Sequence, residues 1–213
     1  MVLVTGPTGS GKTTSLYTFL KTGNSPDIKT ITIEDPIEYH LEGIEQTQVS
    51  PKDVYTFAAG LRAALRQDPD VIMVGEIRDN ETAKIAVESS LTGHIVFSTL
   101  HTNNAAGAIP RLIDLEVSPK IIPSALSLFM AQRLVRKICP NCSGIRQITD
   151  DEKNTLLSLQ KTRGNFEIAN EVPKIVGCDK CSGTGYLGRT GLYEILPVDD
   201  EIRRAIITNI SSP

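Results

Sequence analysis

The amino-acid sequence predicts an α/β fold with a mostly parallel sheet, followed by a small α-rich C-terminal region that carries two cysteine pairs. Three observations lead to this prediction. Short apolar and β-branched runs alternate with helical patterns through the first half of the chain, as in folds whose parallel strands are joined by helices. A glycine-rich segment joins the first run to the first helix. In the second half, four cysteines form two closely spaced pairs.

The opening elements follow from the spacing of apolar residues. Val2–Thr5 is a short apolar run that predicts a buried strand, and the segment 12–21 predicts a helix. Thr30–Glu34 is rich in β-branched residues and predicts a second strand. The segment 56–66 carries apolar residues at helical spacing. Val71–Val74 is a continuous apolar run, as expected of a central parallel strand that is buried on both faces.

The alternation continues to about residue 118. A helix is predicted at 81–91, with Gly93 as its stop signal. Ile95–Leu100 predicts another strand and 103–115 a further helix. Because the pattern changes after Pro119, we expect an α/β domain over residues 1–118 and a C-terminal region over 119–213.

The C-terminal region is predicted to be mainly helical. The apolar residues of 121–138 suit a helix over most of its length, and 150–159 predicts another between the cysteine pairs. The glycine-rich segment 177–191 carries no helix signal. A strand at 191–198 and a short helix at 199–207 complete the prediction.

The composition is that of an ordinary globular protein. Hydrophobic residues make up 40% and charged residues 22% of the 213 positions. The net charge of -3 argues against a non-specific nucleic-acid surface, which is usually basic. The sequence has no apolar run of transmembrane length and no signal-peptide pattern. We therefore expect a cytoplasmic protein with no direct membrane insertion and no nucleic-acid partner.

The segment GPTGSGKT at residues 6–13 matches the phosphate-loop pattern G-x-x-x-x-G-K-[ST] in full. It lies between a predicted strand and a predicted helix, as the motif requires; a chance glycine-rich turn is the alternative. In this motif backbone N–H groups surround the phosphates, the lysine reaches the β- and γ-phosphates, and the following hydroxyl binds Mg²⁺. The motif therefore predicts ATP and Mg²⁺ as ligands. The predicted nucleotide-binding residues are Gly6, Pro7, Thr8, Gly9, Ser10, Gly11, Lys12, Thr13 and Thr14.

Acidic residues follow two other predicted strands. Glu34, Asp35 and Glu38 come after the second strand, and Glu76 comes after the third. Ligands of open α/β sheets bind at the carboxyl ends of the strands, so these acids are candidates for placing a metal ion and a water molecule. Gly75 stands where an aspartate usually follows the apolar run, so Glu76 is predicted to take that role. Either cluster alone is also typical of a solvated acidic turn.

Histidines and arginines add further candidates. His101 follows the strand Ile95–Leu100, where it could sense a γ-phosphate, whereas His94 precedes that strand. Arg62, Arg66 and Arg78 could each stabilise charge in the same or a neighbouring subunit. For each of them an ordinary surface or hydrogen-bonded role is the alternative.

The cysteines form two CxxC pairs, Cys139 with Cys142 and Cys178 with Cys181. Four thiolates arranged in this way suit a closed tetrahedral Zn²⁺ site, which would be structural because it leaves no position for water. In the reducing cytosol disulfides are not expected. Unconnected structural cysteines and a thioredoxin-like redox pair are the alternatives, and the latter lacks a suitable βαβ context.

Four segments together resemble the ATPases of type II secretion and type IV pilus assembly (the GspE/PilB type). They are GPTGSGKT, TIEDPIEY, LRAALRQDPDVIMVGEIRD and TGHIVFSTLHTNNA. They look like the Walker A, Asp, Walker B and His boxes of that family, including its Gly-Glu form of Walker B. The tetracysteine segment (139–181) resembles the secretion and pilus-extension members, whereas retraction members usually lack it.

The resemblance implies a role for each matching residue. Lys12 and Thr13 would bind phosphates and magnesium, and Glu38 would activate the attacking water. Glu76 would be the Walker B carboxylate, and His101 a sensor. It also implies a RecA-like P-loop core.

The resemblance extends to assembly. It implies a homo-hexamer with ATP between the RecA-like domain and an N-terminal domain, and an inner-membrane platform protein as partner. Arg62 and Arg66 match motif arginines of the family. Because the chain opens on its first predicted strand, we expect a fragment without the N-terminal domain, weakly active or catalytically silent. A zinc-bearing RecA-like or conjugation-type nucleic-acid motor is the other alternative, and the acidic balance and 5% aromatic content disfavour it.

Overall fold

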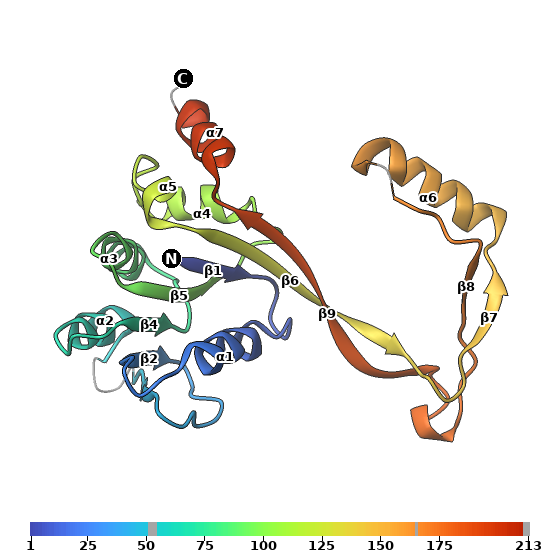
Figure 1. The fold of residues 1–213 in the computed structure, drawn as a ribbon, viewed down its shortest axis with the longest axis horizontal. Coiled ribbons are helices and arrows are strands. Elements are labelled where there is room, and N and C mark those ends of the chain that lie inside the picture. Colours follow the sequence, from blue (N-terminus) through green and yellow to red (C-terminus); the bar gives the residue numbers. More distant parts are fainter. Residues whose placement is uncertain (51–54, 165, 211–213) are drawn as a thin grey trace. The chain divides into compact units, whose positions relative to one another are not determined.

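The structure, a computed structural model, describes residues 1–50, 55–164 and 166–210. It divides into two compact units. The core unit consists of Met1–Leu134 with Gly191–Pro213, and the cysteine unit is Val135–Thr190. The chain enters the cysteine unit along strand β6 (Leu128–Ile138) and leaves it along β9 (Tyr186–Pro197), as Figure 1 shows.

The core sheet has the strand order β3-β2-β4-β5-β1-β6-β9. From β3 to β6, each neighbouring pair is parallel. The carboxyl ends of these strands therefore lie along one edge of the sheet, where ligands of open α/β sheets bind. The first five strands are β1 (Val2–Thr5), β2 (Thr30–Glu34), β3 (Glu45–Gln48), β4 (Val71–Val74) and β5 (Ile95–Leu100). The mostly parallel α/β fold and four of its strands are thus confirmed.

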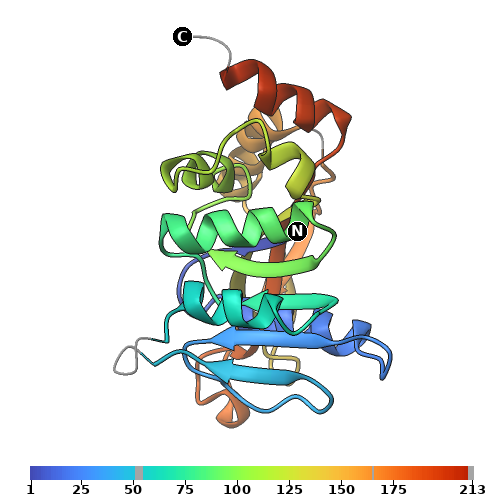
Figure 2. The ribbon, with the colours of Figure 1, turned by 90° about the vertical axis from the view of Figure 1, so that its left-hand side faces the viewer.

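Helices cover both faces of this sheet (Figures 1 and 2). On one face, α1 packs Leu16 and Leu20 against Val4 and Met73. On the other, a larger cluster joins the remaining helices to the alternate strand residues, such as Leu3. Because side chains alternate across a strand, β1, β4 and β6 each contribute residues to both clusters. The helices of the core unit are α1 (Lys12–Gly23), α2 (Phe57–Leu65), α3 (Asn80–Leu91), α4 (Ala108–Asp114), α5 (Ile122–Ala125) and α7 (Asp200–Ile210).

Local capping sets several helix ends. The side chain of Thr56 accepts a hydrogen bond from Ala59 N at the start of α2, and Asp79 accepts one from Thr82 N at the start of α3. The helix predicted at 103–115 begins later, at α4, because Asn104 Oδ1 accepts a hydrogen bond from Gly107 N (2.7 Å) and holds the preceding residues in a turn.

The helix predicted at 121–138 is wrong for most of its length. Only α5 is helical, and β6 occupies the remainder. β6 pairs in parallel with β1, with Leu128 opposite Val2 and Ala131 opposite Thr5. Phe129 and Met130 point into the two opposite clusters, which is the period of a strand. Pairing with β1 overrides an apolar spacing that also suits a helix.

The compact units differ from the predicted division into 1–118 and 119–213. The first part of β6 pairs with β1, and α7 contributes Ile206 to the larger core cluster. The C-terminal region also holds more strand than predicted. These contacts join distant parts of the chain, and a boundary placed by a change of pattern does not detect them.

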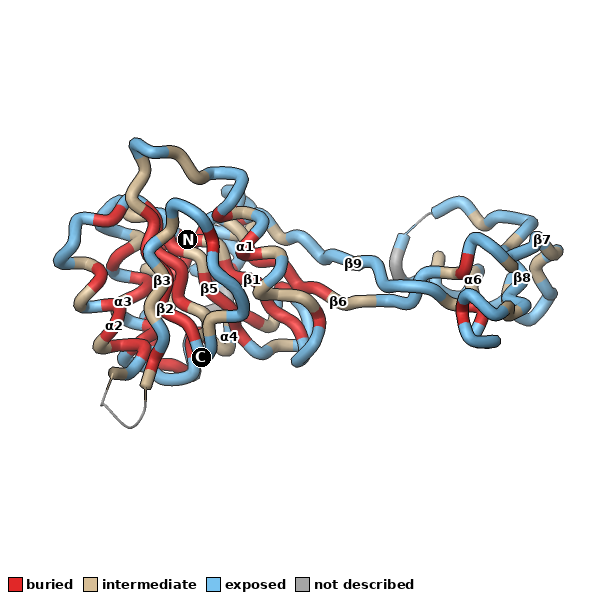
Figure 3. The backbone as a smooth tube through the Cα atoms, turned by 90° about the horizontal axis from the view of Figure 1, so that it is seen from below, coloured by how far each residue is buried: buried red, intermediate tan, exposed pale blue. Residues whose placement is uncertain are grey.

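The cysteine unit contains a two-stranded antiparallel sheet and one long helix. Strands β7 (Gly144–Gln147) and β8 (Glu171–Lys174) pair, and α6 (Asp150–Arg163) begins with a capping box between Thr149 and Glu152. A short 3₁₀ turn, η2 (Asp179–Cys181), carries the second cysteine pair. Figure 3 shows that most of this unit is exposed.

Candidate nucleotide and metal sites

The phosphate loop lies between the end of β1 and the start of α1. Gly6 and Gly11 have φ angles of 147° and 86°, which favour glycine. A Cβ at Gly6 would lie 2.4 Å from the carbonyl oxygen of Gln132, and one at Gly11 would lie 2.9 Å from Gln132 Nε2. Both positions therefore require glycine, because the loop lies directly against β6.

Lys12 lies at the start of α1 and turns back onto the loop. Its Nζ donates hydrogen bonds to the carbonyl oxygens of Gly6 (2.9 Å) and Pro7 (3.2 Å). Partial burial lowers the pKa of Lys12; the Glu76 carboxylate opposes this shift, and Arg133 adds to it. The lysine thus lies between an acid and a second cation, as expected where a charged ligand binds.

The loop also holds polar groups that lack protein partners. Ser10 Oγ is buried and has no hydrogen-bond partner among the described residues. α1 begins at Lys12 without a side-chain cap from Gly11, so its first N–H groups remain available to an anion. These features fit a phosphate group, and Thr13 and Thr14 lie in the first turn of the same helix.

Glu76 follows β4 and has a side chain that is only 13% exposed. Arg78 forms an ion pair with one of its carboxylate oxygens, and His101 Nε2 lies 3.4 Å from the other. Arg78 also lies 3.7 Å from Asp35, and its contact with Glu76 raises the pKa of the guanidinium. The acids after β2 and β4 are thereby joined to the histidine after β5.

The segment after β2 is held by a buried network. The Glu34 carboxylate is 2% exposed and accepts hydrogen bonds from Tyr17 Oη, Thr32 Oγ1 and Gln46 Nε2. Tyr17 Oη also accepts one from the backbone N–H of Glu38 (3.3 Å). The Glu38 side chain itself is exposed. The first acid is therefore a structural anchor, and the last is left to face solvent at the edge of the sheet.

Other sequence candidates lie outside this group. Arg62 pairs with Glu81 of α3 at 2.5 Å, and both side chains are about half exposed. Arg66 is exposed at the C-terminal end of α2. His94 precedes β5, at the opposite end of the strand from His101, where its Nδ1 lies 3.0 Å from the Ser89 carbonyl oxygen. This contact matches the hydrogen-bonded alternative stated for His94.

Two residues of β6 were missed by the sequence analysis. The Gln132 side chain is buried behind the loop, and its Oε1 accepts a hydrogen bond from Ser15 Oγ (2.8 Å). Arg133 donates to the carbonyl oxygen of Asn103 (2.6 Å) and is the second cation beside Lys12. An alternating strand pattern in LFMAQRLV was the available signal, but the helical spacing of the same segment concealed it.

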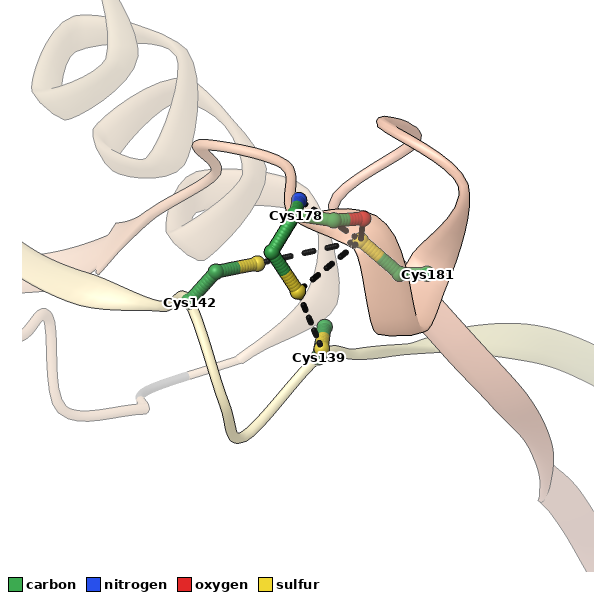
Figure 4. Close-up of side chains that lie close together, drawn as sticks. All are labelled: Cys139, Cys142, Cys178 and Cys181. Carbon is green, nitrogen blue, oxygen red and sulfur yellow. Dashed lines mark hydrogen bonds between the residues drawn. The ribbon is translucent and has the colours of Figure 1, made fainter.

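The four cysteines form one cluster, shown in Figure 4. Their sulfur atoms all lie within 4.8 Å of one another, and Cys139–Cys178 and Cys142–Cys181 are separated by 4.0 and 3.8 Å. Tetrahedral Zn–S bonds of about 2.3 Å place sulfurs about 3.8 Å apart. The spacing and the all-thiol donor set fit Zn²⁺, and all four cysteines are free.

Backbone groups around the cluster stabilise thiolates. Burial alone would raise the pKa of the Cys181 thiol, but N–H donors from Cys178 and Gly185, each 3.2 Å from its sulfur, lower it to about 6. Burial raises the pKa of Cys142 to about 12. An incoming cation would have to displace a proton from Cys142.

Within the described residues, no helix combines the length and apolar character needed to cross a membrane.

The chain has clear relatives. The family described as Type II/IV secretion system protein matches residues 1–212. A type II secretion system protein E from Aeromonas hydrophila is 54% identical over 97% of this chain and 40% of its own length. The type IV pilus assembly ATPase PilB from Thermus thermophilus is 52% identical over 99% of this chain and 23% of its own length. The chain thus spans well under half of these relatives.

Solved structures agree with the fold. The pilus retraction motor PilT with bound ADP is 33% identical, with a TM-score of 0.68, over 98% of this chain and 50% of that one. The ATPase DotB of Legionella pneumophila is 29% identical, with a TM-score of 0.65, over 97% and 47%. These matches agree with the mostly parallel α/β fold that the sequence predicts.

Proposed function

This chain belongs to the Type II/IV secretion system protein family, and we propose that it is the ATP-binding and ATP-hydrolysing part of a motor that drives type II secretion or type IV pilus assembly. Relatives that share about half of its residues are named for these two systems. Their identity to this chain exceeds the 33% of the retraction motor. The tetracysteine segment, expected mainly in assembly members, supports the same choice.

One observation carries the proposal: three strand ends bring a lysine, a largely buried acid (13% exposed) and a histidine together beside the glycine loop. Glu76 influences Lys12 electrostatically and contacts His101 and Arg78. In the proposed reaction Lys12 holds the terminal phosphates and Glu76 helps to hold the metal with Thr13. Mg²⁺, when bound, would neutralise phosphate charge. His101 would respond to the phosphate through Glu76.

Glu38 is proposed to orient and deprotonate the attacking water. Its side chain is exposed at the carboxyl edge of the sheet, while its backbone is anchored to Tyr17. Glu34 is a poor candidate for this role, because its carboxylate already accepts three hydrogen bonds in the core. Glu38→Gln should therefore retain ATP binding and slow hydrolysis.

The cysteine cluster is proposed to hold one structural Zn²⁺. All four ligands would come from Cys139, Cys142, Cys178 and Cys181, so no position stays open for water. The metal would act on the folding of the cysteine unit and not on hydrolysis.

The whole protein is proposed to work as a cytoplasmic homo-hexamer that is peripheral to the inner membrane through a platform protein. The acidic net charge does not favour a nucleic-acid partner. Arg62 and Arg66 would then act between subunits, as their exposure permits.

The test is ATP turnover by the full-length protein, alone, with its membrane partner and with DNA. We expect stimulation by the membrane partner and none by DNA. If DNA alone stimulates turnover, the nucleic-acid motor is the better interpretation. If Glu38→Gln leaves kcat unchanged, another acid is the base.

A further inference from the structure

Tyr17 is the meeting point of two parts of the site. It lies on α1 and is fully buried. Its hydroxyl donates to the Glu34 carboxylate and accepts hydrogen bonds from Glu38 N (3.3 Å) and Gln46 Nε2 (3.4 Å). α1 is the helix that begins with Lys12. A single phenol oxygen thus joins the phosphate-loop helix to the segment that carries the proposed base.

Packing alone does not explain this hydroxyl. Phenylalanine would fill the same space, and a buried hydroxyl is unfavourable unless it is hydrogen-bonded. Thr32 and Gln46 donate to one oxygen of the Glu34 carboxylate, Oε1, whereas Tyr17 donates to the other, Oε2. The hydroxyl therefore serves two partners at once: it donates to Glu34 Oε2 and accepts from the backbone N–H of Glu38.

The network also fixes the direction of the phenol. Its O–H bond points at Glu34, so a lone pair is left toward the Glu38 N–H. Burial, together with the hydrogen bond to Glu34, raises the pKa of Tyr17. The hydroxyl therefore stays protonated and keeps this orientation throughout the physiological pH range. The Tyr39 ring packs edge-on against Tyr17, with centroids 4.8 Å apart, and restrains it further.

We propose that Tyr17 is a positioning residue for hydrolysis, which holds the Glu38 backbone at a set place relative to the helix that bears Lys12 and Thr13. The proposal rests on the proposed role of Glu38. A base must lie within hydrogen-bond reach of the water it activates, and small displacements of a reacting group reduce rates strongly. Among the described residues the phenol oxygen bonds to Glu34, Glu38 and Gln46 and not to the phosphate loop, so nucleotide affinity should not depend on it.

The test is Tyr17→Phe in the full-length protein. We expect kcat to fall about 10-fold while KM for ATP stays within about 2-fold, because the placement of the base changes and the phosphate-loop residues do not. Tyr39→Phe is the matched control: it removes a phenol oxygen from the neighbouring ring and keeps the ring packing, and it should leave kcat unchanged. A Tyr17→Phe enzyme with normal kcat would overturn the proposal.

A double-mutant cycle separates positioning from general stability. If Tyr17 acts through Glu38, adding Tyr17→Phe to Glu38→Gln should lower kcat no further. If the kcat of the double variant falls by the product of the two single losses, Tyr17 acts by another route and the proposal is refuted. If Glu38→Gln itself keeps normal kcat, the proposed function of Glu38 fails first, and this result is distinct from a failure of Tyr17 alone.

A second variant covers the case in which Tyr17→Phe does not fold. Glu34→Gln keeps the size of the anchor and weakens the acceptor that orients the phenol. It should reproduce the selective loss of kcat at constant KM. In the Glu38→Gln background it should lower kcat no further. Normal kcat in Glu34→Gln would then overturn the proposal.

Discussion

Different interactions stabilise the folds of the core unit and the cysteine unit. The core unit buries two large apolar clusters, one on each face of a parallel sheet. In the described part of the cysteine unit, the only buried side chains are those of Cys139 and Cys181. Its long helix α6 has no buried residue among those described, and Leu157 and Leu159 are each 42% exposed.

This difference indicates where folding free energy comes from. A sheet that is covered on both faces gains its stability from apolar burial. A unit of fewer than 60 residues without an apolar core needs another source, such as a disulfide or a metal ion. Because its four thiols are free and clustered, a metal is the available source. The two units should therefore respond to different perturbations.

The largest expected effect is that of metal removal. A structural zinc contributes about 10 kcal/mol or more to the folding of a small domain. A strong chelator, or Cys181→Ser, should unfold the cysteine unit and expose it to proteases. The core unit should keep its own melting transition, which serves as the internal control. Elemental analysis should find about one zinc per chain; a reduced, metal-free protein with a folded cysteine unit would contradict the comparison.

The next effect concerns activity and is confined to the core unit. Lys12→Ala in the full-length protein should lower kcat by about 100-fold or more, because the cation on the terminal phosphates is lost. Its melting temperature should hardly change, since the hydrogen bonds of Lys12 to the described residues go to two carbonyl oxygens of the loop. Lys21→Ala, at the far end of the same helix, is the control. Normal turnover by Lys12→Ala would refute the proposed phosphate site.

A pair of leucine truncations compares the two units directly. Leu61 is fully buried in the larger cluster, so Leu61→Ala should lower the free energy of unfolding by about 2–5 kcal/mol. Leu157→Ala, on α6, should change it by less than about 0.5 kcal/mol. Chemical denaturation of the metal-loaded protein measures both. Equal losses would mean that α6 is packed in solution and that the cysteine unit has an apolar core after all.

The smallest effect is electrostatic and lies in the cysteine unit. The Arg146 guanidinium and the Thr149 amide hold the pKa of Glu152 at about 2, below its ordinary 4.5. A lowered pKa stabilises the folded state above pH 4.5, and the contribution is lost as the pH falls toward 2. Arg146→Gln should raise the pKa of Glu152 in an NMR titration, whereas Lys153→Gln should not. An unchanged value in Arg146→Gln would remove the ion pair as its cause.

Prediction from sequence succeeded where the signal was local. The strands at Val2–Thr5 and Val71–Val74 have the bounds that their apolar runs indicated, because a central parallel strand is buried on both faces. The phosphate-loop motif predicted a strand before it and a helix after it, and the structure has β1 and α1 at these places. Glu76 and His101 were each expected after a strand, at one edge of a parallel sheet, and the structure places them 3.4 Å apart. Prediction failed for β6, whose apolar spacing fits two periods equally well.

The amino-acid sequence by itself determined the parallel α/β fold, the glycine loop and the cysteine pairs, because each depends on the spacing of residues that are near one another in the chain. The tertiary structure alone decided that β6 is a strand, that Gln132 and Arg133 lie against the loop, and that Tyr17 joins Glu34 to Glu38. Each of these results depends on pairing or burial between distant segments. Such contacts depend on the packing of the whole sheet, and the local propensity of a segment does not specify them.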